Sequence, residues 1–107
     1  MTKYHVLWRL NPAAPWPMDP IKALEMNEKM WMAMDDSMKK GLITEYGVFP
    51  DGTSGYLIGE GDATNILRGA SIFVPFIMSE AQEIIPYEKQ KEVLRGVLKA
   101  QIAAMKK

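Results

Sequence analysis

Few polar side chains in this chain are placed to carry chemistry, and three of them fall in two predicted strands. His5 and Arg9 share the mixed face of a predicted strand from Lys3 to Asn11, and Glu45 lies in the middle of the next predicted strand. A histidine with a pKa near neutrality transfers protons when a carboxylate lies beside it. These three residues are a candidate polar site at a face where two copies of the chain would meet. The alternative is that they line this dimer face without doing chemistry.

Asn27 is a second candidate, because its amide falls near the middle of the apolar arc of a predicted helix from Asp19 to Lys40. A buried amide without a partner costs on the order of 1–3 kcal/mol, so it is expected to form a hydrogen bond. The partner is either a nearby protein group or water, or a ligand for which Asn27 is the polar anchor in an apolar cavity.

Tryptophans surround the same region. Trp8 in the first strand and Trp31 in the helix are expected to face each other across the strand–helix interface, next to several methionines. Such a group of side chains makes either a large, adaptable core or a pocket for a flat hydrophobic molecule. Trp16 lies in the proline-rich segment NPAAPWPMDP, Asn11 to Pro20, which is either a stiff connector or a fixed cap over one end of that layer.

Composition argues against several functional classes. Thirteen basic residues balance thirteen acidic ones, so no overall charge favours nucleic acid or an anionic membrane. The chain has no cysteine and one histidine, and Glu28 and Asp35 alone are weak evidence for a cation site. No glycine-rich nucleotide motif is present, so we expect neither a metal nor a cofactor.

The chain has no apolar run of about 20 residues and no signal-peptide pattern at its start. We therefore expect a cytoplasmic protein that does not enter a membrane. With 107 residues, of which 48% are hydrophobic, residues 1–107 are expected to form one domain.

Hydrophobic periodicity and turn signals predict seven elements in the order strand, helix, strand, strand, helix, strand, helix. These are Lys3–Asn11, Asp19–Lys40, Leu42–Phe49, Ser54–Glu60, Asp62–Ala70, Glu80–Ile85 and Tyr87–Lys107. The first six form a ferredoxin-like βαββαβ pattern of the α+β class, to which the last adds a C-terminal helix. Helices then cover only one face of the sheet, so we expect a homodimer in which a second copy covers the other face.

The segment DGTSGYLIGEGDATNILRGASIFVPFIMSEAQEIIPYEKQKEVL, Asp51 to Leu94, adds a family resemblance. Four features of this segment are similar to the second half of small dimeric α+β-barrel proteins. They are a Gly-Tyr-apolar strand that ends in an acidic residue, a short helix after an aspartate, a bend at a proline and a closing Ile-Pro. This group includes muconolactone-isomerase-like domains and an uncharacterised relative. The resemblance implies a ferredoxin-like protomer that dimerises through its sheet. It also implies a cavity between sheet and helices, which relatives use as isomerases, cofactor-free oxygenases or haem enzymes. No catalytic residue of the family has a counterpart here. A haem protein is disfavoured, because His5 is the only strong haem ligand and it lies on the mixed strand face.

These observations predict a protein that binds a small hydrophobic or aromatic molecule between the sheet and the first helix. Trp8, Asn27 and Trp31 would line the site and Trp16 would close it. Any reaction would be of the isomerase or cofactor-independent oxygenase type. The competing hypothesis is a non-enzymatic structural or regulatory oligomerisation module. An open cavity with an unpaired Asn27 favours the binding protein, and a methionine-filled core with Asn27 bonded to backbone favours the module.

Overall fold

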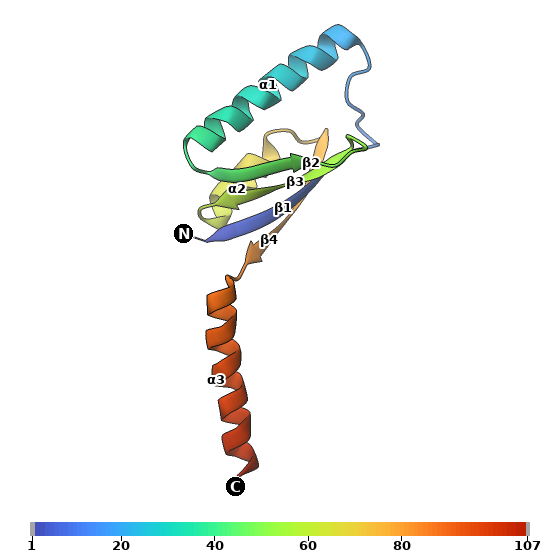
Figure 1. Cartoon of the computed structure of the whole chain (residues 1–107). Coiled ribbons are helices and arrows are strands. Elements are labelled where there is room, and N and C mark those ends of the chain that lie inside the picture. Colours follow the sequence, from blue (N-terminus) through green and yellow to red (C-terminus); the bar gives the residue numbers. More distant parts are fainter. Residues whose placement is uncertain (1, 107) are drawn as a thin grey trace.

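A computed structural model describes residues 2–106 as an α+β fold with one four-stranded antiparallel sheet and three helices (Figure 1). The strand order across the sheet is β2-β3-β1-β4, so β1 and β3 are central and β2 and β4 form the edges. The elements are β1 (Lys3–Leu10), α1 (Pro20–Lys39), β2 (Ile43–Val48), β3 (Ser54–Glu60), α2 (Ala63–Ser71), β4 (Ile77–Ile84) and α3 (Tyr87–Met105).

Local sequence signals explain where the first two helices begin. The Asp19 carboxylate accepts a hydrogen bond from the backbone N–H of Ile21 at 3.2 Å, and Pro20 occupies the first helical position of α1. Asp62 caps α2 in the same way, by accepting from the backbone N–H of Asn65 at 2.9 Å. All seven predicted elements are present, in the predicted order.

The fourth strand differs from its prediction. It begins at Ile77 rather than at Glu80 and ends at Ile84. The proline at position 75 interrupts the apolar run before it, but pairing with β1 resumes at once, because Ile77 lies opposite Leu10 and is buried. Pairing across the sheet therefore extends the strand beyond what its own residues suggest.

The two faces of the sheet differ as the alternation in the first strand predicts. Val6 and Trp8 of β1 are buried on the face that α1 and α2 cover, and Leu7 and Arg9 are exposed on the other face. Together with Ile77 of β4, Val6 and Trp8 are the only hydrophobic side chains in residues 2–106 that are less than about a tenth exposed. The core is therefore very small.

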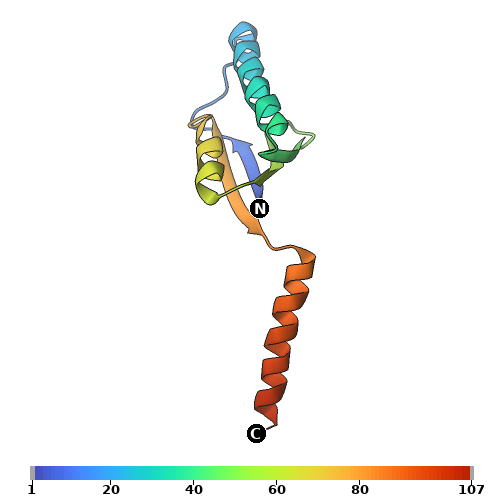
Figure 2. The same cartoon turned by 90° about the vertical axis from the view of Figure 1, so that its left-hand side faces the viewer.

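The last helix, α3, lies outside this layered part. It continues away from the end of β4 and makes no substantial contact with another described element (Figures 1 and 2). The described chain measures 71 × 29 × 25 Å, and its radius of gyration is 19.1 Å. A compact chain of this length has a radius of gyration of about 13 Å.

No helix among residues 2–106 combines the length and apolar character needed to cross a bilayer.

Candidate ligand-binding cavity

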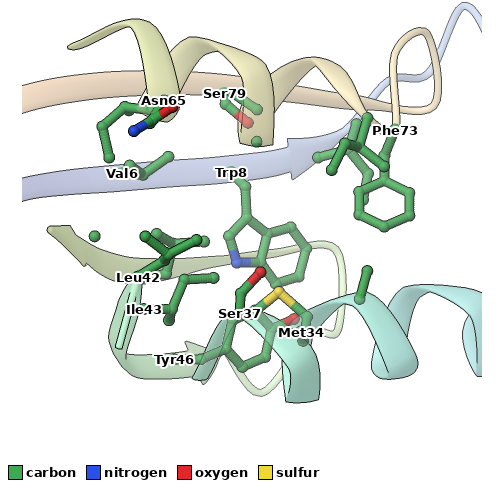
Figure 3. A pocket seen from close by; sticks show the side chains of 18 of the residues that line it. Val6, Trp8, Met34, Ser37, Leu42, Ile43, Tyr46, Asn65, Phe73 and Ser79 are labelled. Carbon is green, nitrogen blue, oxygen red and sulfur yellow. The ribbon is translucent and has the colours of Figure 1, made fainter. Parts of the chain in front are cut away.

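A cavity of about 140 Å³ lies between the covered face of the sheet and helices α1 and α2 (Figure 3). It is partly open to solvent, and its wall is mostly apolar. The strands contribute Val6, Trp8, Ile43, Tyr46, Leu57, Gly59, Glu60, Ile77 and Ser79. The helices and their adjoining loops contribute Met30, Ala33, Met34, Ser37, Leu42, Asn65, Ile66, Gly69, Ala70, Ile72 and Phe73.

Small residues create this space. Gly55 lies opposite Trp8 in the sheet, and a Cβ atom at Gly55 would come within 2.5 Å of the indole Cζ2. A Cβ at Gly59 would come within 2.9 Å of Cδ1 of Ile66. The missing side chains let the Trp8 ring lie across β3 and let α2 approach the sheet. On the α1 side of the cavity, the small side chain of Ala33 leaves space unfilled.

Trp8 is the most informative residue in the wall. Its side chain is nine-tenths buried, and its Nε1–H is the only buried side-chain polar group in the described part of the chain without a hydrogen-bond partner. The indole stacks on Tyr46, with ring centres 5.9 Å apart and an angle of 6° between the planes. A buried donor without an acceptor costs on the order of 1–3 kcal/mol. Trp8 therefore brings to the cavity wall a buried hydrogen-bond donor that no protein group satisfies.

Tyr46 is a second donor in the wall. Its partial burial raises the pKa of the phenol above the ordinary value, because the charged phenolate loses solvation. The hydroxyl therefore stays protonated at neutral pH. Glu60, the one carboxylate in the wall, forms an ion pair with Lys3 at 3.5 Å.

A β-bulge explains why Tyr46 reaches the cavity. Ile43 and Tyr46 are three positions apart, so strict alternation places them on opposite faces of β2. The register shifts between Ile43 and Glu45, and as a result Ile43 pairs with Gly59 and Tyr46 pairs with Leu57. Both side chains therefore line the cavity. Sequence reasoning missed Tyr46, because the shift has no clear signature in the strand itself.

The structure brings only part of the predicted substrate site together. Trp8 lines the cavity, but Asn27 does not: its amide donates to the backbone carbonyl of Ala23, one helical turn earlier, at 2.8 Å. Trp31 is 48% exposed and also lies outside the wall, so Trp8 stacks on Tyr46 instead of facing Trp31. Trp16 contacts Phe76 edge to face, with ring centres 6.0 Å apart, and is not a wall residue either.

The predicted polar site lies on the opposite, open face of the sheet. His5 stacks on Tyr56, with ring centres 5.8 Å apart, and the Tyr56 hydroxyl donates a hydrogen bond to the Glu45 carboxylate. This hydrogen bond, together with burial and the negative charge of Glu45, raises the pKa of Tyr56. Tyr56, which the sequence analysis did not single out, therefore joins His5 to Glu45. Arg9 lies further along β1, opposite Ser54 and Met78.

Neither face assembles a metal centre in the described range. No group of three or more histidine, cysteine, aspartate or glutamate side chains comes together within residues 2–106. The wall residues that can form hydrogen bonds are few: Trp8, Ser37, Tyr46, Glu60, Asn65 and Ser79.

Comparison with protein-family models finds no family that matches this chain, and comparisons with curated proteins and with solved structures find no significant match.

Proposed function

We propose that this chain binds a small aromatic molecule that carries a hydrogen-bond acceptor, in the cavity between the sheet, α1 and α2. The observation that carries the proposal is the buried Nε1–H of Trp8, which lies in the wall of this cavity without a partner. A carbonyl, carboxylate or phenolate oxygen on the ligand would accept this hydrogen bond. The burial cost of the donor would then be recovered only in the complex.

The size of the cavity limits the ligand. A volume of about 140 Å³ is close to that of an apolar cavity of roughly 150 Å³ that binds benzene. The space therefore suits a single ring with a short substituent. The flat stack of Trp8 and Tyr46 and the flexible side chain of Met34 provide a surface against which such a ring would pack (Figure 3).

The same wall defines the chemistry that would be possible. Glu60 and Tyr46 are its titratable groups. A reaction there would depend on positioning, with few acid or base groups, which fits an isomerase or a cofactor-independent oxygenase.

The protomer that we propose is ferredoxin-like, and it pairs with a second copy through the open face of its sheet. Leu7 of β1 and Met78 of β4 are 43% and 41% exposed on that face. Tyr56 of β3 stacks there on both His5 and Phe49. A second sheet would cover these side chains and would enclose the polar cluster around Tyr56.

One observation favours the alternative, a non-enzymatic oligomerisation module. Asn27 forms its hydrogen bond with the helix backbone and has no role in the cavity. The unpartnered Trp8 donor and the open space favour the binding protein, and the next experiment separates the two functions.

The test compares benzoate with toluene, because both have one ring but only benzoate has acceptor oxygens. We expect calorimetric titration to show benzoate binding to the unmodified chain, and Trp8→Phe to weaken it about tenfold while toluene affinity stays the same. Trp31→Phe is the matched control, because Trp31 lies outside the cavity wall. Failure of both probes to bind would favour the module, and equal loss of both in Trp8→Phe would show that the Nε1–H does not recognise the acceptor.

A further inference from the structure

Helix α3 carries an apolar stripe that nothing in the described chain covers. At 100° per residue, its members fall on one side of the helix, and each is about half exposed or more: Tyr87, Leu94, Leu98, Ile102 and Met105. Figures 1 and 2 show α3 extending from the end of β4 with no other element beside it. Most helical stability in proteins comes from packing of the apolar side, which α3 lacks in a single chain. The stripe therefore requires a partner.

The exposed area of the whole chain indicates how much surface that partner must cover. The accessible surface is 8199 Å². A compact monomer of 12.1 kDa exposes about 6,000 Å². The excess of roughly 2,000 Å² per chain exceeds the ~800 Å² that each partner buries in a standard protein–protein interface and falls in the range of obligate homodimers, which bury about 1,000–2,500 Å² per partner. A second copy of the same chain brings the same excess and the same stripe.

The charges beside the stripe indicate which partner fits. One flank of α3 has glutamates in its first half and lysines in its second half: Glu88, Glu92, Lys99 and Lys106. When two copies of a helix pair antiparallel, this flank faces the same flank of the other copy in reverse order. Glu88 then lies near Lys106 of the second copy, and Glu92 lies near its Lys99. Charges at such flanking positions select partner and orientation in paired helices.

A parallel pair lacks this match. The charged flank of one helix would then face the other flank of its partner, whose residues carry no charge: Gln90, Val97, Gln101 and Ala104. Two further cations lie on this side of α3: Lys91 falls within the stripe, between Leu98 and Ile102, and Arg95 falls between the stripe and the charged flank. Lys91 contacts the Tyr87 ring and forms an ion pair with Glu88 of its own chain at 3.1 Å. Arg95 would lie near its own counterpart in an antiparallel pair, which offsets part of the gain from the four matched charges.

We propose that α3 pairs antiparallel with α3 of a second copy of this chain, with the two-fold axis near Gly96. The stripe is self-complementary in this arrangement, as a two-fold interface requires. Tyr87 at the start of one helix lies near Met105 at the end of the other. This pairing depends neither on the cavity nor on the open face of the sheet.

The lack of cysteine in the sequence allows a clean test by disulfide formation. Two variants, Tyr87→Cys and Met105→Cys, are oxidised separately and as a mixture. Antiparallel pairing gives mainly the mixed product, which links one chain of each variant, about tenfold above either like-with-like product, because only this pair of positions comes within disulfide range. A dominant like-with-like product from Met105→Cys alone would show parallel pairing and overturn the proposal. Absence of any linked product would also overturn it, since something other than α3 would then cover the stripe.

Sedimentation equilibrium provides a second measurement. Leu98→Asp puts a charge in the centre of the stripe, and we expect it to raise the dissociation constant of the α3-mediated association by about 30-fold or more. Ala103→Asp is the matched control on the opposite side of α3 and should leave that constant unchanged.

Glu88→Lys should weaken the association, and the added change Lys106→Glu should restore it. An equal effect of Leu98→Asp and Ala103→Asp, or no effect of either, would contradict the proposal. Benzoate binding tests the proposed function separately, since none of these positions lines the cavity.

Discussion

The indole of Trp8 in β1 and the phenol ring of Tyr46 in β2 stack nearly parallel, although β3 separates their strands. Gly55 of β3 lies between them in the register, opposite both Trp8 and Val48. Because Gly55 has no side chain, the two rings meet over the backbone of β3. This contact fixes the plane of the indole and thus the direction in which the unpartnered Nε1–H points.

We expect Gly55→Ala to disturb this stack. A Cβ there would collide with the backbone oxygen of Gly47 and would come within 2.5 Å of the indole, and overpacking of this kind costs about 1–3 kcal/mol of unfolding free energy. Urea denaturation measures the loss, and benzoate affinity should fall with it. Gly96→Ala is the matched control, because a Cβ there meets no atom and alanine stabilises a helix interior by about 0.8–1 kcal/mol relative to glycine. A neutral Gly55→Ala would show that Trp8 does not depend on Gly55 for its position.

Filling the cavity should separate stability from binding. Ala33 lies in the wall on the α1 side, and Ala33→Leu adds apolar volume to the open space. We expect the unfolding free energy to stay the same or to rise by about 1 kcal/mol, because new apolar surface is buried without a clash. Benzoate and toluene should both lose affinity, as calorimetry will measure. Ala100→Leu, on the outer side of α3, should leave both affinities unchanged. Retained binding in Ala33→Leu would place the ligand elsewhere.

Asn27→Leu should be close to neutral. The amide is bonded only to the carbonyl of Ala23 within the same helix, and leucine has the higher helix propensity. We expect the unfolding free energy to change by less than about 1 kcal/mol, with benzoate affinity unaffected. Loss of binding in this variant would mean that the ligand reaches beyond the cavity toward the start of α1.

Tyr56 should affect stability at alkaline pH. Its pKa is raised above the ordinary 10.0, first by the hydrogen bond to Glu45, so the folded state holds the phenol proton more tightly than the unfolded state. The resulting stability is fully present below pH 10.0 and is lost as the pH rises through the folded-state pKa. Tyr56→Phe should therefore flatten the alkaline decline in unfolding free energy, measured by urea denaturation across this pH range. Tyr87→Phe, on α3, is the control and should follow the unmodified chain.

Much of the architecture follows from local patterns. The alternation in β1 correctly assigns Val6 and Trp8 to the covered face, and the caps at Asp19 and Asp62 correctly mark the starts of two helices. The site was harder to predict, because a helical wheel shows which side of α1 is apolar but not which part of its length overlies the sheet. The wall residues of α1 start at Met30, so Asn27 lies one turn too early to reach the cavity. Tyr46 depends on a bulge, which arises from strand pairing and not from the periodicity of β2.

The length of α3 also affects how the chain behaves in solution. A particle of 71 × 29 × 25 Å experiences more friction than a sphere of the same mass, so it diffuses and sediments more slowly. On a gel-filtration column a single copy would elute with larger globular standards and would resemble a dimer. Its mass in solution therefore has to come from a shape-independent measurement such as light scattering or sedimentation equilibrium. Small-angle scattering would show directly whether the long axis is that of one chain or of two.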